Sequence, residues 1–265
     1  MSFRFERDMT ELLINEFEEF MNTIKKDYKD YIYACEYPIY YRMVDLCIAS
    51  YCNEYNQFME CIDYEKAIKK LSSKCFSILA LISANKKVSI NKIEKELFIK
   101  RLELEKCLDI LCKSGLVEKV TERSYVLGSW NVILPKEIIA VELKLSKWQE
   151  ALEQGIFNLQ FADYSYVVLD KARINESSLL VEEYKKNNVG LIYMSNDGKY
   201  EVKYMPKRNK KISIYKSHYY KIKILKDFKI NGKRSRNIFN TRSFFIYSKE
   251  YFFMKSSKHL LHIFI

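Results

Sequence analysis

The sequence lacks any run of the roughly 18–20 uninterrupted apolar residues that a membrane-spanning helix needs. Its opening residues, Met-Ser-Phe-Arg-Phe-Glu-Arg-Asp, carry charges where a secretory signal has an apolar block. These two absences predict a protein that contacts no membrane, with the cytoplasm as its expected location. The composition of the 265-residue chain, with 48% hydrophobic and 30% charged residues, is typical of a folded chain with a sizeable core.

Cysteine pairs with metal-binding spacing are also missing. The seven cysteines form no Cys-x-x-Cys motif, their number is odd, and none of the three histidines lies near them in the chain. This pattern argues against a disulfide framework and against a structural zinc site, so we expect ordinary buried thiols. The cysteines occupy positions 35, 47, 52, 61, 75, 107 and 112, and the histidines 218, 259 and 262.

The net charge of +11 is concentrated near the end of the chain. From Pro206 onward there are 16 Lys and Arg but only two acidic residues, Asp227 and Glu250, so the net charge is +14. The net charge of the first 205 residues is −3. A basic segment favours a polyanionic partner, most often nucleic acid, through counterion release. A solvated tail or a lysine-rich coding bias is the alternative. The candidate DNA contacts here are Lys207, Arg208, Lys210, Lys211, Lys233, Arg234 and Arg236.

On either side of residues 56–130, the apolar pattern predicts a mixture of helices and strands. Helical spacing covers residues 5–26, and two strands at 32–39 and 42–49 are separated by Tyr40-Tyr41, as in a hairpin. Beyond residue 206 no clean period is present. The later elements are expected as strands at 137–145, 164–169, 190–194 and 200–204, and as helices from Ser146, with Gln149 at capping-box spacing, and at 177–187.

Residues 56–130 have a different pattern, with helices expected at 64–71, 74–84, 89–97 and 101–114. Ser89 stands at an N-cap position, and Gly115 ends the last helix before a hairpin at 116–127. The segment, with its ending LxxLxxSGLVEK…YVL, resembles a winged helix-turn-helix. The resemblance implies DNA contacts from the third helix, whereas acidic neighbours on that helix favour a protein-interaction or dimerising module. The basic candidates are Lys100, Arg101 and Lys106, and the acidic neighbours Glu103, Glu105 and Asp109.

The strand Val-Glu-Leu-Lys at 141–144 carries the residues with the clearest chemistry. Alternate side chains of a strand share a face, so Glu142 and Lys144 point away from the core-facing Val141 and Leu143. The same alternation sets Asp45 apart from its apolar neighbours. Carboxylates inside apolar strands need a compensating partner, and a divalent ion bound by Asp45 and Glu142 would supply one. A site with a small number of hard oxygen ligands suits Mg²⁺, or Mn²⁺ in its place.

These residues resemble the PD-(D/E)xK nuclease superfamily. The stretch IIAVELKLSKWQEALEQGIFNLQFADYSYVVL resembles that family's third strand, second helix and fourth strand. The resemblance implies a restriction-endonuclease-like mixed sheet flanked by helices, with Asp45 and Glu142 as metal ligands and Lys144 as the catalytic lysine. It implies that Glu6 and Gln154 support the site. Glu11 or Glu16 could serve in place of Glu6, and Gln154 could be an ordinary polar helix position.

The chain departs from that family in two ways. Met43-Val44 precedes Asp45, so the proline of the motif is absent, and 97 positions separate Asp45 from Glu142. The winged-helix segment fills this gap, and such an insertion is cheap because loop-closure entropy grows slowly with length. The predicted organisation has three parts. A nuclease-like core covers 1–55 and 131–205, an inserted winged-helix domain covers 56–130, and a basic C-terminal segment covers 206–265.

The expected function is Mg²⁺-dependent hydrolysis of DNA phosphodiester bonds, with double-stranded DNA as the partner. The alternative is an inactive nuclease-fold protein that acts as a DNA-binding regulator or a protein-interaction module. An RNA-directed nuclease would differ only in its substrate, and a homodimer is compatible with either function. The 21 tyrosines are interpreted as packing residues rather than as base-stacking platforms.

Overall fold

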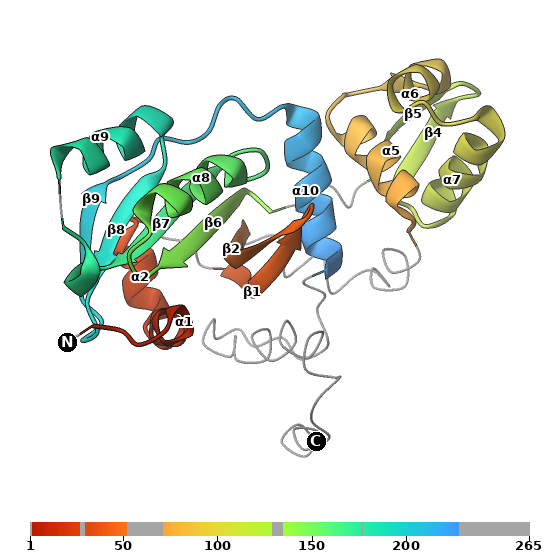
Figure 1. Cartoon of the computed structure of the whole chain (residues 1–265). Helices are drawn as coiled ribbons and strands as arrows, with labels where there is room; N and C mark the ends of the chain where they lie inside the picture. Colours follow the sequence, from red (N-terminus) through yellow and green to blue (C-terminus); the bar gives the residue numbers. More distant parts are fainter. Residues whose placement is uncertain (1, 27–29, 52–70, 129–134, 176, 228–265) are drawn as a thin grey trace, which may run out of the picture. The chain divides into compact units, whose positions relative to one another are not determined.

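The computed structural model describes residues 2–26, 30–51, 71–128, 135–175 and 177–227 (Figure 1). The chain forms two compact units, each considered by itself. Of the described residues, the first unit holds those within 2–48 and 138–209, and the second those within 49–137 and 210–227. No helix within these ranges has the length and apolar character needed to cross a bilayer.

A six-stranded mixed sheet, in the order β1-β2-β6-β7-β8-β9, forms the centre of the first unit. Strands β6, β7 and β8 are parallel, and β9 runs antiparallel to β8. Ser50 contacts Lys136 and Asp45 contacts Leu143, which makes β2 antiparallel to β6. The strands are β1 (Asp30–Ile39), β2 (Arg42–Tyr51), β6 (Glu137–Lys144), β7 (Tyr164–Asp170), β8 (Gly190–Met194) and β9 (Tyr200–Tyr204). The predicted mixed sheet flanked by helices is confirmed at this level.

Helices cover both faces of the sheet (Figure 1). Helices α1 (Glu6–Asn15) and α2 (Phe17–Thr23) bury Leu13 and Phe20 against one face. Helices α8 (Trp148–Asn158) and α9 (Ser178–Asn187) bury Leu152 and Tyr184 against the other. Because β6 and β7 are covered on both sides, their sequences are nearly continuous apolar runs, as expected of buried parallel strands. Polar residues inside these strands therefore stand out.

Most boundaries in the first unit agree with the sequence pattern, with two exceptions. The single helix predicted over 5–26 is wrong, because the backbone breaks at Glu16 (φ −110°, ψ 33°) and two helices form. The capping role predicted for Ser146 is also wrong. Lys147 is the N-cap residue of α8 and makes no side-chain capping hydrogen bond, while Ser146 accepts from the Trp148 N–H through its backbone carbonyl.

The second unit combines helices with a three-stranded sheet of order β3-β5-β4. Ser72 and Ser89 cap the first two helices with their hydroxyl groups, as predicted for Ser89, and Gly115 adopts the left-handed φ of +71° after the third. The elements are α5 (Ser73–Ser83), β3 (Val88–Ser89), α6 (Ile90–Leu97), α7 (Arg101–Lys113), β4 (Val117–Thr121), β5 (Ser124–Leu127) and α10 (Ile214–Asp227).

Helix α10, which packs against α5, was not apparent from the sequence because aromatic and lysine residues alternate there without a clear period. The helix predicted at 64–71 lies largely outside the described residues. None of the cysteines that the structure describes is in a disulfide bond, and four of them are buried: Cys35, Cys47, Cys75 and Cys107. The prediction of ordinary buried thiols is confirmed for those four.

Helix α8 lies close to the sheet because Gly155 has no side chain. A Cβ atom at Gly155 would lie 2.6 Å from Val189 Cγ1 and 3.3 Å from Val167 Cγ2. We expect Gly155→Leu to lower the free energy of unfolding by about 2 kcal/mol or more, because both valines are too stiff to move aside. Glu153→Leu, at an exposed position of the same helix, should change it by less than about 0.5 kcal/mol. Urea denaturation measures both, and equal effects would contradict the close packing.

Candidate active site

Asp45 and Glu142 meet on the α8 side of the sheet. Strand alternation turns Leu46 and Leu143 into the core under α1 and α2, and leaves both carboxyl groups on the opposite face. Asp45 Oδ2 accepts a hydrogen bond from the Leu143 N–H at 2.7 Å, and the Asp45 and Glu142 carboxyl groups are hydrogen-bonded to each other. Pairing of β2 with β6 thus joins residues separated by 97 positions in the sequence.

Burial makes a double negative charge costly at this pair. Glu142 is only 2% exposed. Its burial and the adjacent Asp45 raise the pKa of Glu142, against a hydrogen bond of 2.6 Å that Asn158 Nδ2 donates to Glu142 Oε1. Burial also raises the pKa of Asp45, although the Leu143 N–H and the Lys144 ammonium oppose the shift. In the absence of a further cation, the pair therefore retains a proton that exposed carboxyl groups would lose.

Lys144 lies beside the carboxyl pair, two residues along β6 from Glu142. Its side chain is 14% exposed, and its Nζ is 3.1 Å from Glu6 Oε2 and 4.0 Å from Glu150 Oε1. Burial alone would lower the pKa of Lys144, but Glu6, Asp45 and Glu150 outweigh it, so the pKa is raised. Lys144 consequently stays positively charged at neutral pH.

Helix α8 presents a polar stripe to these residues. Glu150, Gln154 and Asn158 stand at successive i, i+4 positions; Glu150 approaches Lys144, and Asn158 bonds to Glu142. Gln154, between them, has a buried Oε1 atom that finds no hydrogen-bond donor within the described residues. Sequence reasoning missed Asn158 and Glu150, although the spacing of four from Gln154 was a usable signal.

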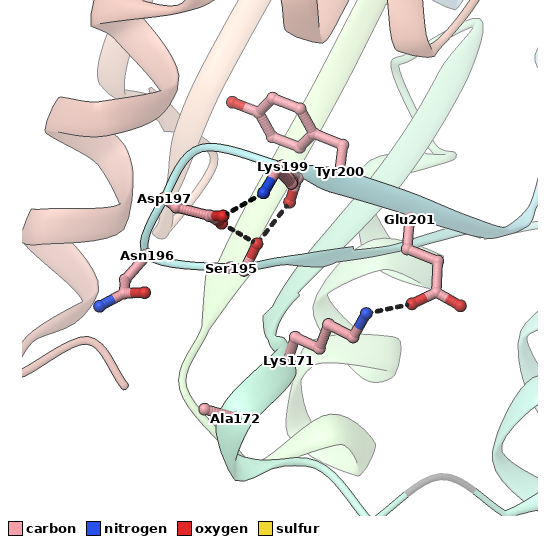
Figure 2. Close-up of a pocket in the computed structure, with 8 residues that line it drawn as sticks. All are labelled: Lys171, Ala172, Ser195, Asn196, Asp197, Lys199, Tyr200 and Glu201. Carbon is pink, nitrogen blue, oxygen red and sulfur yellow. Dashed lines mark hydrogen bonds and ion pairs between the residues drawn. The ribbon is translucent and has the colours of Figure 1, made fainter. Parts of the chain in front are cut away.

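The alternatives to Glu6 lie elsewhere. Glu11 is exposed and paired with Arg7, whereas the Glu16 carboxylate lies against Gly198 in the β8–β9 turn. A pocket beside that turn is lined by residues that pair among themselves, including Lys171 with Glu201 at 2.9 Å and Lys199 with Asp197 at 2.7 Å (Figure 2). It lies toward the opposite edge of the sheet from β2 and is separate from the carboxyl pair.

The basic residues proposed for DNA contact fall into three groups. Lys100, Lys106, Lys207, Lys210 and Lys211 have exposed side chains. Two arginines are held by acidic residues: Arg101 lies 3.2 Å from Glu94, and Arg208 donates to Asp163 Oδ1 at 2.8 Å. Asp163 is buried and also accepts from the Ile138 N–H, so the Arg208 contact anchors the segment that follows β9. The positions that lie outside the described residues are Lys233, Arg234 and Arg236.

The donor set of the carboxyl pair fits a hard divalent cation. Mg²⁺ characteristically binds through one or two carboxylates and keeps several waters. Asp45 and Glu142 supply two carboxyl groups as ligands, and a cation would replace the proton that the pair otherwise retains. Over the described ranges, no group of three or more His, Cys, Asp or Glu side chains is arranged to hold a metal.

Comparisons of the chain with protein families, curated proteins and solved structures find no match. A functional assignment therefore depends on the geometry and chemistry described above.

Mn²⁺ or Mg²⁺ should raise the thermal unfolding midpoint of the wild-type protein, and more strongly at pH 8.5 than at pH 6. The raised pKa values of Asp45 and Glu142 mean that a cation competes with protons for the pair. A hundredfold excess over Kd corresponds to about 2.7 kcal/mol, or roughly 5–10 °C. Differential scanning fluorimetry of wild type, Asp45→Asn and the surface control Glu153→Gln tests this. A pH-independent shift, or one retained in Asp45→Asn, would contradict it.

Without added metal, the carboxyl pair should make stability depend on pH. Because the folded-state pKa of Glu142 lies above the ordinary value of 4.5 for a glutamate, folding favours the protonated form. The free energy of unfolding should therefore fall as pH rises from about 4.5, by at most about 1.4 kcal/mol per pH unit for one proton, and level off above the folded-state pKa. Glu142→Gln should remove this component and Glu153→Gln should keep it. Parallel pH profiles for wild type and Glu142→Gln in chemical denaturation would exclude it.

Proposed function

We propose that the protein is a metal-dependent nuclease of the PD-(D/E)xK type, acting on DNA phosphodiester bonds. The observation that carries the proposal is the buried Asp45–Glu142 pair with the Lys144 ammonium beside it. Two carboxyl groups and a lysine on neighbouring buried strands are a costly arrangement for a purely structural protein. The same three groups suit hydrolysis of a charged phosphodiester.

Each residue of the site would have a distinct role in such a reaction. A divalent ion, when bound by Asp45 and Glu142, would lower the pKa of an attacking water and neutralise phosphate charge. Lys144, with its raised pKa, suits stabilisation of negative charge on the scissile phosphate better than removal of a proton from water. Glu6 holds the Lys144 ammonium, and Asn158 orients the Glu142 carboxyl by donating to Oε1.

The second unit is consistent with a winged helix-turn-helix. Its element order and the sheet order β3-β5-β4 support that reading, in which α7 is the third helix of the motif. The lack of net positive charge on α7 favours a protein contact over DNA, because Glu103, Glu105 and Asp109 balance its three basic residues. Nearby, Phe98 is 92% and Leu102 is 68% exposed. This patch supports the second candidate function, a protein-interaction or dimerising module attached to an inactive nuclease fold.

Cleavage assays separate the two functions. With Mg²⁺ or Mn²⁺, we expect wild type to cleave DNA, and Asp45→Asn and Lys144→Ala to lose about 100- to 1,000-fold in rate, the scale seen when one charge-stabilising group is removed. Lys147→Ala is the matched control, because Lys147 lies three residues from Lys144, is 76% exposed and pairs with the same Glu150. It should retain activity within about twofold.

The assay should include single-stranded, double-stranded and branched DNA together with RNA, with and without EDTA. Cleavage that persists in EDTA, or that is equal in wild type, Asp45→Asn and Lys144→Ala, would rule out the proposed site. Absence of cleavage on all substrates, combined with binding that Asp45→Asn leaves unchanged, would favour the inactive binding module.

A further inference from the structure

The turn between β1 and β2 exposes aromatic rings to solvent. Tyr40 is 58% and Tyr41 81% exposed, and their ring centroids lie 5.9 Å and 5.7 Å from that of Phe157 on α8. Tyr40 also adopts a φ of +54°, a left-handed conformation that glycine or asparagine adopts at lower cost. Neither the turn geometry nor core burial therefore explains why tyrosines occupy these two positions.

Arg42 adds a planar cation to this aromatic cluster, which we call the Tyr40–Phe157 platform (Tyr40, Tyr41, Arg42 and Phe157). Its guanidinium carbon lies 5.0 Å from the Phe157 centroid and 5.8 Å from that of Tyr41. Guanidinium groups stack on aromatic faces and also pair with phosphate. Exposed aromatic rings combined with arginine are the side chains that bind unpaired bases and their backbone.

The platform continues into the candidate active site along both of its elements. On β2, Met43 shares the sheet face of Asp45 by strand alternation and is 42% exposed, so it lies between Tyr41 and the carboxyl pair. On α8, Phe157 is followed directly by Asn158, which bonds to Glu142. Asp45 follows Tyr41 by four positions, which correspond to about 13 Å of extended chain.

We propose that the Tyr40–Phe157 platform stacks unpaired bases, so that the substrate of the site is nucleic acid with a single-stranded stretch next to the scissile phosphate. The position of the cut in this inference rests on the proposed nuclease function, whereas the binding of bases does not. In a continuous duplex the base faces are covered by their neighbours, and exposed rings could reach them only by unstacking the helix. A single strand, an overhang or a gap offers those faces directly.

Fluorescence anisotropy in EDTA tests the platform without any cleavage. Labelled oligonucleotides are a single strand of mixed sequence, the matching blunt duplex and the same duplex with an overhang. Tyr41→Ala should weaken binding of the single strand and of the overhang by about tenfold, the scale of losing one aromatic–base stack, while duplex binding stays within about twofold. Tyr41→Trp should retain binding. Phe98→Ala, which removes a 92% exposed ring from the second unit, is the control and should have no selective effect.

Several outcomes would overturn the inference. Single-strand binding that Tyr41→Ala leaves unchanged excludes stacking on this ring, and an equal loss for single strand and duplex makes the platform a general duplex surface. Unchanged oligonucleotide binding together with an altered oligomeric state of Tyr41→Ala in sedimentation would assign the rings to a protein interface. If Tyr41→Ala loses single-strand binding while no substrate is cleaved, stacking stands and the nuclease function fails. If wild type and Tyr41→Ala cleave blunt duplex equally well, the nuclease function stands and the single-stranded substrate is excluded.

Discussion

The charge balance at one buried point, where Asp45 and Glu142 share a hydrogen bond, governs the chemistry of the first unit. Two ionised carboxylates in this position would repel each other in surroundings that solvate them poorly, so the pair requires a proton or a cation. The surrounding groups are arranged around that requirement. The Leu143 N–H and Asn158 fix the carboxyl oxygens, while Lys144 supplies positive charge and is itself held by Glu6.

The sheet is what makes this arrangement possible. Strands β6 and β7 are buried on both faces, which fixes their positions between two helical layers. Glycine at position 155 lets α8 approach β7 and β8 closely enough for Asn158 to reach Glu142. Most of the second unit is inserted in the chain between β2 and β6, two strands that pair with each other, whereas its helix α10 follows β9. Loop-closure entropy grows only slowly with length, so the sheet tolerates that insertion.

The proposed substrate class depends on the Tyr40–Phe157 platform. The many tyrosines of the chain were interpreted as packing residues, and for those in the core that interpretation is right: Tyr33, Tyr166 and Tyr184 are almost completely buried. Tyr40 and Tyr41 differ because they stand in a turn, where no layer covers them. These exposed rings lie next to the carboxyl pair, and we propose that they contact unpaired bases.

The sequence by itself determined most of the secondary structure, because strand alternation and helical spacing are local patterns. The same alternation was enough to separate Asp45, Glu142 and Lys144 from their apolar neighbours. The helix break at Glu16, the start of α8 after Lys147 and the existence of α10 were not predicted, since tertiary packing rather than local spacing decides them. Only the tertiary structure decided which residues meet: Asn158 with Glu142, Glu6 rather than Glu11 or Glu16 with Lys144, and Tyr41 with Phe157. Such contacts depend on strand pairing and layer packing between segments far apart in the chain, and no local pattern encodes them.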